Sequence, residues 1–545
     1  MTTATRHTPF PTAGRVEIHG PLRDRYDEIL TPDALDFLAL LDNTFAADRR
    51  QLLDRRRHRR ARLTDGTETP HFLPETAAIR DDPTWRVPPP PPGLLDRRVE
   101  ITGPPDRRMT VNALNSGAKV WMADFEDATA PTWDNIIGGQ LNLHDAIRRR
   151  LDFTTDTGRR YRIAEDPATI VPRPRGWHLV EKHLRIDGRP VSASLVDFGL
   201  HVFHNATRLI QDGSGPYLYL PKLENHREAR LWNEVFLLAQ RALGLPPGTI
   251  RATVLIETIT AAFEMDEILH ELRDHAAGLN AGRWDYLFSL IRTLGGRGAD
   301  VVLPDRARLT MTVPFMRAYT ELLVRTCHRR GAHAIGGMAA VIPSRDPDAN
   351  REALAQVRQD KDREATDGFD GSWVAHPALV PVCGEAFTAV LGDRPHQLHR
   401  TRDDVDVTAD QLLDLGGAGR EVTREGVRSN VGVCLRYLDA WLRGSGAVAI
   451  HGLMEDAATA EIARAQLWQW IHTATTLTDG TTVTRDLVGE ALRAELDVIR
   501  AENPEATRLD AAVDILTATA LGPTMPDFLT PHAYAHHLTL SLIHI

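Results

Sequence analysis

Short apolar runs alternate with amphipathic stretches through the middle of this chain, and this alternation limits the possible folds more than any other feature. A run that is apolar at nearly every position fits a strand buried on both faces, as in a parallel sheet covered by helices. With this many units, the sequence predicts an α/β fold, a (β/α)8 barrel, ahead of a doubly wound open sheet. No GxGxxG follows the early runs, which disfavours the open sheet. The runs are KVWMADFED, RGWHL, PYLYLPKLE, ATVLIET, YLFSLI, ADVVLP, AHAIGGMAAVIP and GSWVAHP.

The two flanks of this region have helical patterns. TPDALDFLALLDNTFAADRRQLLDRRRHRRARL carries apolar residues at helical spacing, and Thr31 or Asp33 could cap its start. Its arginine-rich second half is interpreted as a solvated helix face. The proline run between Arg86 and Leu95 predicts a stiff extended linker. Helical periodicity returns from about residue 405. We therefore expect an N-terminal helical segment and linker over 1–95, the barrel over 96–400, and a C-terminal all-helical domain over 401–545.

Composition excludes several classes of function. The net charge of −10 disfavours a nucleic-acid partner, which would call for a basic excess. The three cysteines, Cys327, Cys383 and Cys434, lie in no CxxC motif, which favours a reducing compartment. MTTATRHTPFPTAG lacks the apolar core of a signal peptide, the final Ser-Leu-Ile-His-Ile is no peroxisomal signal, and no stretch approaches the roughly 20 apolar residues of a membrane helix. We expect a cytoplasmic protein with no membrane partner.

Polar side chains stand at the ends of the predicted strands, with Asp285 placed at the mouth of the strand YLFSLI. A single such acid more often caps a helix or pairs with a surface lysine, but a series of them at the carboxyl ends of barrel strands would converge. The series is rich in carboxylates and poor in Cys and His, which suits Mg²⁺ better than zinc. Glu257 and Asp285 are the best pair of ligands. The whole series is Asp124, Glu126, Asp127, Arg173, Arg175, Lys222, Glu224, Glu257 and Asp285.

Two further motifs bear on chemistry. In PHAYAHHL, His532 and His536 have a spacing that can bind zinc on a helix, but no acid partner lies nearby, so this site is disfavoured. Asp456 in GLMEDAAT follows an apolar run and precedes a helical one, which predicts a helix N-cap.

The stretch RDHAAGLNAGRWDYLF resembles the signature of the malate synthase family: a basic residue, Asp, His, two free positions, Gly-Leu-Asn, then Gly-x-Trp-Asp-Tyr-x-Phe. Further blocks from about residue 96 to 475 are also similar to the family, among them RPRGWHL, IGGMAAVIP, DKDREATDGFDGSWVAHP and HGLMEDAATAEIARAQLWQW. The compact spacing is similar to that of the shorter, A-type enzymes.

The resemblance implies an enzyme of the glyoxylate bypass that condenses acetyl-CoA with glyoxylate and hydrolyses the product to malate and CoA, feeding the tricarboxylic acid cycle. It implies Mg²⁺ as cofactor, and it assigns Arg173 as the catalytic arginine, with Arg175 as the alternative. The remaining assignments are Glu257 and Asp285 as metal ligands, Asp456 as catalytic acid/base, Asp124, Glu126 and Asp127 as the acids that order metal-bound waters, Trp284 as a substrate contact, and Trp373 and Pro377 as part of the acetyl-CoA pocket.

Two alternatives stay open on the sequence alone. One is a Mg²⁺-dependent acyl-CoA lyase on a related barrel, and the other is a non-catalytic barrel that acts as a scaffold. MEDAAT in a separate helical domain and the complete GLNxGxWDY block favour the synthase. The presence of Glu257, Asp285 and Asp456 disfavours the scaffold.

Overall fold

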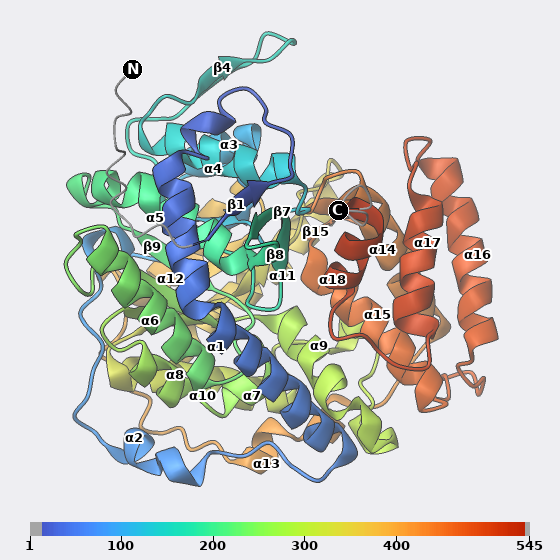
Figure 1. Cartoon of the computed structure of the whole chain (residues 1–545). Coiled ribbons are helices and arrows are strands. Elements are labelled where there is room, and N and C mark those ends of the chain that lie inside the picture. Colours follow the sequence, from blue (N-terminus) through green and yellow to red (C-terminus); the bar gives the residue numbers. More distant parts are fainter. Residues whose placement is uncertain (1–13, 540–545) are drawn as a thin grey trace.

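The computed structural model describes residues 14–539, and its centre is a barrel of eight parallel strands (Figure 1). The hydrogen-bonded order is β6-β3-β2-β13-β12-β11-β10-β9, and the two end strands, β6 and β9, contact each other. The strands therefore follow one another around the barrel in chain order, and the predicted (β/α)8 barrel is confirmed. They are β2 (Val99–Gly103), β3 (Val120–Asp124), β6 (Thr169–Arg173), β9 (Tyr217–Leu220), β10 (Arg251–Ile256), β11 (Ala276–Ala281), β12 (His333–Ala339) and β13 (Gly371–Val374).

Helices cover the outside of the barrel, and side chains fill its inside. Val120, Met122, Tyr219, Leu255 and Trp373 belong to the apolar cluster inside the strands. A buried layer on both sides of each strand explains why the strands read as near-continuous apolar runs. The covering helices are α3 (Arg107–Leu114), α4 (Trp133–Ile147), α5 (Ala193–Gln211), α6 (His226–Ala242), α7 (Ile259–Ala262), α8 (Met265–Glu271), α9 (Arg283–Leu294), α10 (Pro314–Arg330), α11 (Pro347–Asp367) and α12 (Val380–Leu391).

Three of the predicted strands are wrong. YLFSLI lies in α9, whose residues from Asp285 to Leu294 are all buried, and a helix buried on every side has the same apolar pattern as a buried strand. ADVVLP begins with a 3-10 turn over Ala299–Val301. RGWHL follows strand β6 and forms the turn before β7 (Val180–Ile186). The strand that precedes it, TIVPR, contains a proline, which usually argues against a central strand.

The N-terminal region is dominated by α1 (Pro32–Asp65), which crosses the outside of the barrel in dark blue (Figure 1) and contacts α5, α6 and α9. The Thr31 side chain accepts a hydrogen bond from the Ala34 backbone N–H at 3.2 Å, which confirms Thr31 as the cap. The arginine-rich half is not a fully solvated face, because Arg49 and Arg56 are buried and bond to groups of the barrel. Three short strands, β1 (Val16–Ile18), β7 and β8 (Arg189–Ser192), form a small antiparallel sheet.

The proline run lies against the barrel in an extended conformation. The Arg251 guanidinium donates to the carbonyls of Pro88 and Pro89 at 3.0 and 3.1 Å. The run leads into Leu94, which is buried in the apolar cluster inside the barrel strands.

The C-terminal region is mostly helical and lies beside the barrel (Figure 1, orange and red). Its helices are α13 (Ala409–Leu412), α14 (Arg424–Leu442), α15 (Ala457–His472), α16 (Arg485–Glu502), α17 (Leu509–Leu516) and α18 (Leu529–Ala533). The all-helical prediction needs one correction, because a hairpin of β14 (Val448–Ile450) and β15 (Leu453–Glu455) precedes α15. This hairpin is joined to the barrel by main-chain hydrogen bonds, Met454 N to Ala340 O at 2.8 Å and Ile342 N to Gly452 O at 2.8 Å.

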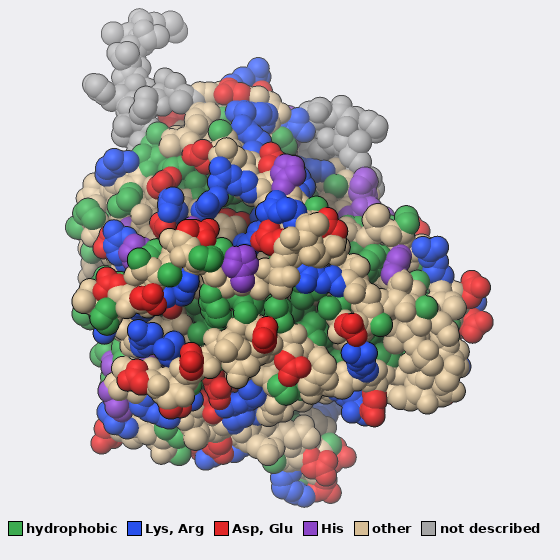
Figure 2. Space-filling model, turned by 90° about the horizontal axis from the view of Figure 1, so that it is seen from below, with side chains coloured by type: hydrophobic (Ala, Val, Ile, Leu, Met, Phe, Trp, Pro, Cys, Tyr) green, Lys and Arg blue, Asp and Glu red, His purple; other side chains and the backbone are tan. Residues whose placement is uncertain are grey.

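Basic and acidic side chains are interspersed on the face shown in Figure 2, without a block of one sign. Within residues 14–539, no helix combines the length and the apolar character needed to cross a bilayer.

Gly371 at the start of β13 gives a stability prediction. A Cβ built at this residue would lie 1.6 Å from the Arg97 carbonyl oxygen of the neighbouring backbone. Gly371→Ala is therefore expected to lower the free energy of unfolding by about 1–3 kcal/mol or more, because two strands would have to move apart. Gly138→Ala is the control, since its Cβ would meet only Tyr26 at 3.7 Å. Equal denaturation midpoints for the two variants would contradict the prediction.

Candidate active site

Asp127, Glu257 and Asp285 form a cluster of buried carboxylates at the carboxyl ends of the barrel strands. One oxygen of each lies within 4.8 Å of the others. Asp127 follows β3, Glu257 follows β10, and Asp285 follows β11, so their loops meet at the same end of the barrel. Asp285 is not at the mouth of a strand as predicted: it lies in the first turn of α9, where free backbone N–H groups favour a carboxylate.

A lysine lies in the middle of this cluster. The Lys222 ammonium is 2.9 Å from Asp127 Oδ1, 2.9 Å from Asp285 Oδ2 and 3.3 Å from Glu126 Oε2. Its backbone N–H donates to Glu257 Oε1 at 2.6 Å. Sequence reasoning noted Lys222 only as a polar strand end and gave it no role. The signal that was available is a lysine directly after a buried strand, where its charge requires acidic partners.

Arg173 lies beside the cluster, and its partners orient it. Its guanidinium forms a two-point ion pair with Asp124, at 2.7 Å from Nε to Oδ1 and 2.5 Å from Nη2 to Oδ2. Nη1 is 3.2 Å from Asp127 Oδ2. Asp124 also accepts the backbone N–H groups of Glu126 and Ala128, so it holds the turn that presents Asp127.

Arg175, two residues later, has different partners. Its guanidinium is ion-paired with Asp197 at 2.8 Å and with Glu181 at 2.9 Å, and it is 1% exposed. Asp197 belongs to α5 and Glu181 to β7, so Arg175 ties the outer layer together. Of the two arginines, Arg173 is the one that contacts the carboxylate cluster.

Asp456 comes from the C-terminal region and reaches the same pocket. It is the N-cap of α15, where its Oδ1 accepts the Ala458 N–H at 3.1 Å, so the predicted cap is confirmed. The hairpin before it and the hydrogen bond from Ala457 N to Asp127 O, at 3.2 Å, hold it against the barrel. One pocket, here called the mouth pocket, is lined by Asp127, Arg173, Glu257, Trp284, Asp285, Trp373 and Asp456 together with neighbouring residues.

The other predicted residues differ in where they lie. Trp284 lines the mouth pocket, with the Arg283 guanidinium 4.1 Å from its ring centre. Trp373 reaches the pocket from inside the barrel, where its Nε1 donates to Glu100 Oε2 at 3.0 Å. Pro377 begins a 3-10 turn after β13 and is not among the pocket's lining residues. Asp124 and Glu126 also do not line it.

The crowding of acids changes their proton affinities. Burial, with Asp127 nearby, raises the pKa of Asp285 to about 6 against the opposing effect of Lys222. Burial and the Asp127 carboxylate raise the pKa of Asp456 well above its usual range, and burial does the same for Glu257. Burial also acts on Asp127, but Lys222 and Arg173 outweigh it and lower the pKa. Asp127, Glu257, Asp285 and Asp456 are therefore more acids than Lys222 and Arg173 can balance.

These residues fit an oxygen-bound divalent cation. Asp285 Oδ1 is buried and has no hydrogen-bond partner within the described part of the chain. The donor set is made of carboxylate oxygens, which Mg²⁺ prefers. Across residues 14–539, one other group has ligand spacing, Glu28, His144 and Asp145, and Arg25 already forms ion pairs with both of its acids. His532 and His536 belong to neither group.

A closed parallel barrel whose carboxyl end carries an acidic cluster and an oriented arginine defines a class of TIM-barrel enzyme built for a hard divalent cation. The model of the malate synthase TIM barrel domain matches residues 169–415, and those of the malate synthase N-terminal domain and C-terminal region match 15–78 and 421–537. A malate synthase from Streptomyces clavuligerus is 60% identical over 526 residues, 95% of this chain and 97% of that relative. The chain belongs to the malate synthase family, and its function is the enzymatic synthesis of malate from acetyl-CoA and glyoxylate.

Two other relatives are similar over almost their whole length. A malate synthase from Myxococcus xanthus is 51% identical over 524 residues, 95% of this chain and 96% of the relative. Malate synthase A from Escherichia coli is 47% identical over 519 residues, 94% of this chain and 96% of the relative.

Proposed function

We propose that the mouth pocket is where this chain performs the condensation, with Asp456 as the base, Arg173 as the group that stabilises developing charge, and Glu257 and Asp285 as the ligands of Mg²⁺. One observation carries the proposal: Asp456, from the C-terminal region, lines the same pocket as Arg173 and the carboxylate cluster, which come from the barrel. An acid, a cation and a candidate metal site in one pocket are the groups that carbon–carbon bond formation from a thioester requires.

The chemistry follows from the residue types. Bound Mg²⁺ supplies a Lewis acid that polarises the aldehyde of glyoxylate. Asp456 removes a proton from the methyl group of acetyl-CoA, and its raised pKa makes it a stronger proton acceptor than an exposed aspartate. Arg173 donates N–H groups to the enolate oxygen as negative charge develops there.

Bond making and bond breaking then balance. The enolate carbon attacks the aldehyde carbon of glyoxylate, a carbon–carbon bond forms and the aldehyde π bond opens. The aldehyde oxygen gains a proton to become the hydroxyl group, which balances the proton that Asp456 removed. Water next adds to the thioester carbonyl, the carbon–sulfur bond breaks, and CoA leaves as the free thiol. Malate keeps the carboxylate formed by this hydrolysis and the carboxylate of glyoxylate.

The decisive experiment measures release of free thiol from acetyl-CoA. We expect thiol release to require both glyoxylate and Mg²⁺ and to stop when EDTA is added. A lyase would instead cleave malyl-CoA to acetyl-CoA and glyoxylate without producing thiol, and a scaffold barrel would do neither. Thiol release that is independent of glyoxylate would overturn the proposal.

Arg173→Lys tests the arginine. The lysine keeps the charge but loses the planar fork that pairs with Asp124, so we expect turnover to fall at least roughly tenfold. Arg175→Lys is the matched control, and it should lower the melting temperature more than the turnover, because its ion pairs join α5 to β7. Near-normal turnover in Arg173→Lys together with a large loss in Arg175→Lys would transfer the role to Arg175.

The remaining assignments belong to the same proposal. We propose that Asp127, with Asp124 and Glu126 behind it, orders waters of the metal, that Trp284 contacts substrate, and that Trp373 and Pro377 contribute to the acetyl-CoA pocket. A cytoplasmic enzyme of the glyoxylate bypass, feeding the tricarboxylic acid cycle, is consistent with cysteines that are all buried and unpaired. The division at residues 95 and 400 separates the N-terminal helical segment, the metal-binding barrel and the region that carries Asp456.

A further inference from the structure

We propose that Lys222 is a positioning residue that decides which carboxylate oxygens can reach the metal, and that it thereby favours Mg²⁺ over Ca²⁺. This inference rests on the proposed function, because it assumes that Glu257 and Asp285 hold the cation. It gives a role to a residue that the mechanism above does not use.

The contacts of Lys222 divide the oxygens of the cluster into two sets. The ammonium donates hydrogen bonds to both oxygens of Asp127, at 2.9 and 3.0 Å, and to Asp285 Oδ2 at 2.9 Å. The Lys222 backbone N–H donates a hydrogen bond to Glu257 Oε1. Asp285 Oδ1 is buried and accepts no hydrogen bond from any residue between 14 and 539, and the Lys222 N–H contacts Oε1 of Glu257, not Oε2. One free oxygen therefore remains on each of the two candidate ligands.

The backbone of Lys222 is fixed in a conformation that side chains rarely adopt. Its φ is 54°, in the left-handed region, which is costly for a residue with a Cβ and persists only where the surroundings impose it. The N–H is held by Glu257, and the carbonyl oxygen accepts from Arg56 Nη2 at 2.8 Å. Arg56 is itself paired with both carboxylate oxygens of Glu228 on α6. The peptide unit on each side of the lysine is thus anchored.

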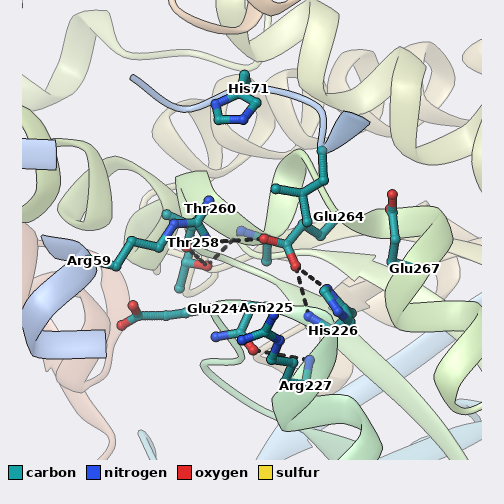
Figure 3. A network of polar contacts seen from close by, with 12 residues as sticks. Arg59, His71, Glu224, Asn225, His226, Arg227, Thr258, Thr260, Glu264 and Glu267 are labelled. Atoms are coloured by element: carbon teal, nitrogen blue, oxygen red, sulfur yellow. Dashed lines mark hydrogen bonds and ion pairs between the residues drawn. The ribbon is translucent and has the colours of Figure 1, made fainter. Parts of the chain in front are cut away.

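The loop that continues from Lys222 is anchored as well. Figure 3 shows its next residues, where the backbone N–H of His226 and its ring Nδ1 both contact Glu264 Oε2, at 3.0 and 2.6 Å. Arg59 from α1 reaches the other oxygen of Glu264 at 2.9 Å. Arg56 and Arg59 of α1 therefore hold the loop that presents Lys222.

This division of oxygens has a consequence for the metal. Mg²⁺ accepts a nearly ideal octahedral set and usually takes one or two protein carboxylates, whereas Ca²⁺ takes six to eight oxygens and tolerates carboxylates that bind through both oxygens. With Lys222 in place, Asp285 and Glu257 would each offer one oxygen to the cation, and water and glyoxylate would supply the other ligands. Without it, Asp127 Oδ1 and Asp285 Oδ2 would become available, and the site would gain the larger oxygen set that suits Ca²⁺.

The test is calorimetric titration of the complete chain with MgCl₂ and with CaCl₂, in the absence of substrates. Lys222→Met removes the ammonium and keeps an unbranched side chain of similar length. We expect the ratio of the Ca²⁺ to the Mg²⁺ association constant to rise at least about tenfold. Lys361→Met is the matched control, because Lys361 is a buried lysine that lines the mouth pocket and contacts Gly337 O and Glu364, neither of which is a candidate ligand. The control should leave the ratio unchanged.

The outcomes separate this inference from the proposed function. If the unmodified protein binds neither cation, the metal site itself is wrong and both fall. If it binds Mg²⁺ and the ratio is unchanged or falls in Lys222→Met, only the role of Lys222 is overturned. Thermal unfolding in saturating MgCl₂ establishes that the variant is folded. Should Lys222→Met fail to fold, Lys222→Gln carries the same test with the same criterion.

Discussion

Asp456→Asn is expected to fold, to bind Mg²⁺ and glyoxylate normally, and to lose condensation by a factor of at least roughly 10². Asp456 caps α15 through its Oδ1, and asparagine caps a helix about as well, so a purely structural role predicts an almost silent change. A catalytic role predicts the opposite, because an amide has nearly the same shape but cannot accept the methyl proton. The two roles are compatible, because the cap hydrogen bond uses Oδ1 and the carboxylate has a second oxygen that can accept the proton.

Thiol release measured at matched thermal stability distinguishes these roles. The control is Thr484→Asn, which replaces the N-cap of α16, a helix of the same region that contributes no residue to the mouth pocket. If Asp456→Asn retains turnover within a few-fold of the parent protein, Asp456 is only a cap and the base lies elsewhere.

Glu257→Gln should abolish Mg²⁺-dependent binding of glyoxylate while the fold stays intact. Glutamine keeps an oxygen that can accept the Lys222 N–H, so the local hydrogen bond is preserved, but it removes the charge that a divalent cation needs. Without the cation, the substrate carboxylate has no metal to bind, and the remaining acids of the cluster repel it.

Calorimetric titration with glyoxylate in the presence of MgCl₂ is the measurement. Glu267→Gln serves as the control for loss of a buried carboxylate, because Glu267 contacts Thr76 and Arg80 and lies outside the mouth pocket. Unchanged glyoxylate affinity in Glu257→Gln would remove Glu257 from the metal site.

The barrel could be predicted because a strand that is buried on both faces has a near-continuous run of apolar residues. Not every strand could be assigned to the right segment, because helix α9 is buried on all sides and has the same apolar pattern as a buried strand. The actual strand, β11, has the sequence AAGLNA, whose small residues are weak strand formers in isolation. The strand is AAGLNA and not YLFSLI because of how the two segments are buried in the folded chain. For this reason Asp285 was predicted at the end of a strand, although it lies in the first turn of a helix.

The choice between Arg173 and Arg175 shows a different limit. Both are arginines of one short segment, and nothing local separates them. Their partners, Asp124 on one side and Asp197 on the other, come from different parts of the chain. The same is true of Lys222, whose role depends on carboxylates supplied by three other loops. Sequence patterns identify such residues as polar strand ends, and only the closed barrel shows which of them meet.

The position of the β14–β15 hairpin in the chain affects the order in which the active site forms during synthesis on the ribosome. Because the barrel residues are translated first, a nascent chain can gather Glu257 and Asp285 long before the segment that carries Asp456 leaves the exit tunnel. The hairpin can dock only on a barrel whose β12 is already in place, since its hydrogen bonds are made to the residues that follow that strand. Synthesis from the N-terminus therefore adds Asp456, the proposed base, after the proposed metal ligands. If Asp456 is the base, as proposed, an unfinished chain that lacks it would not generate the enolate of acetyl-CoA, and incomplete molecules would not consume the thioester.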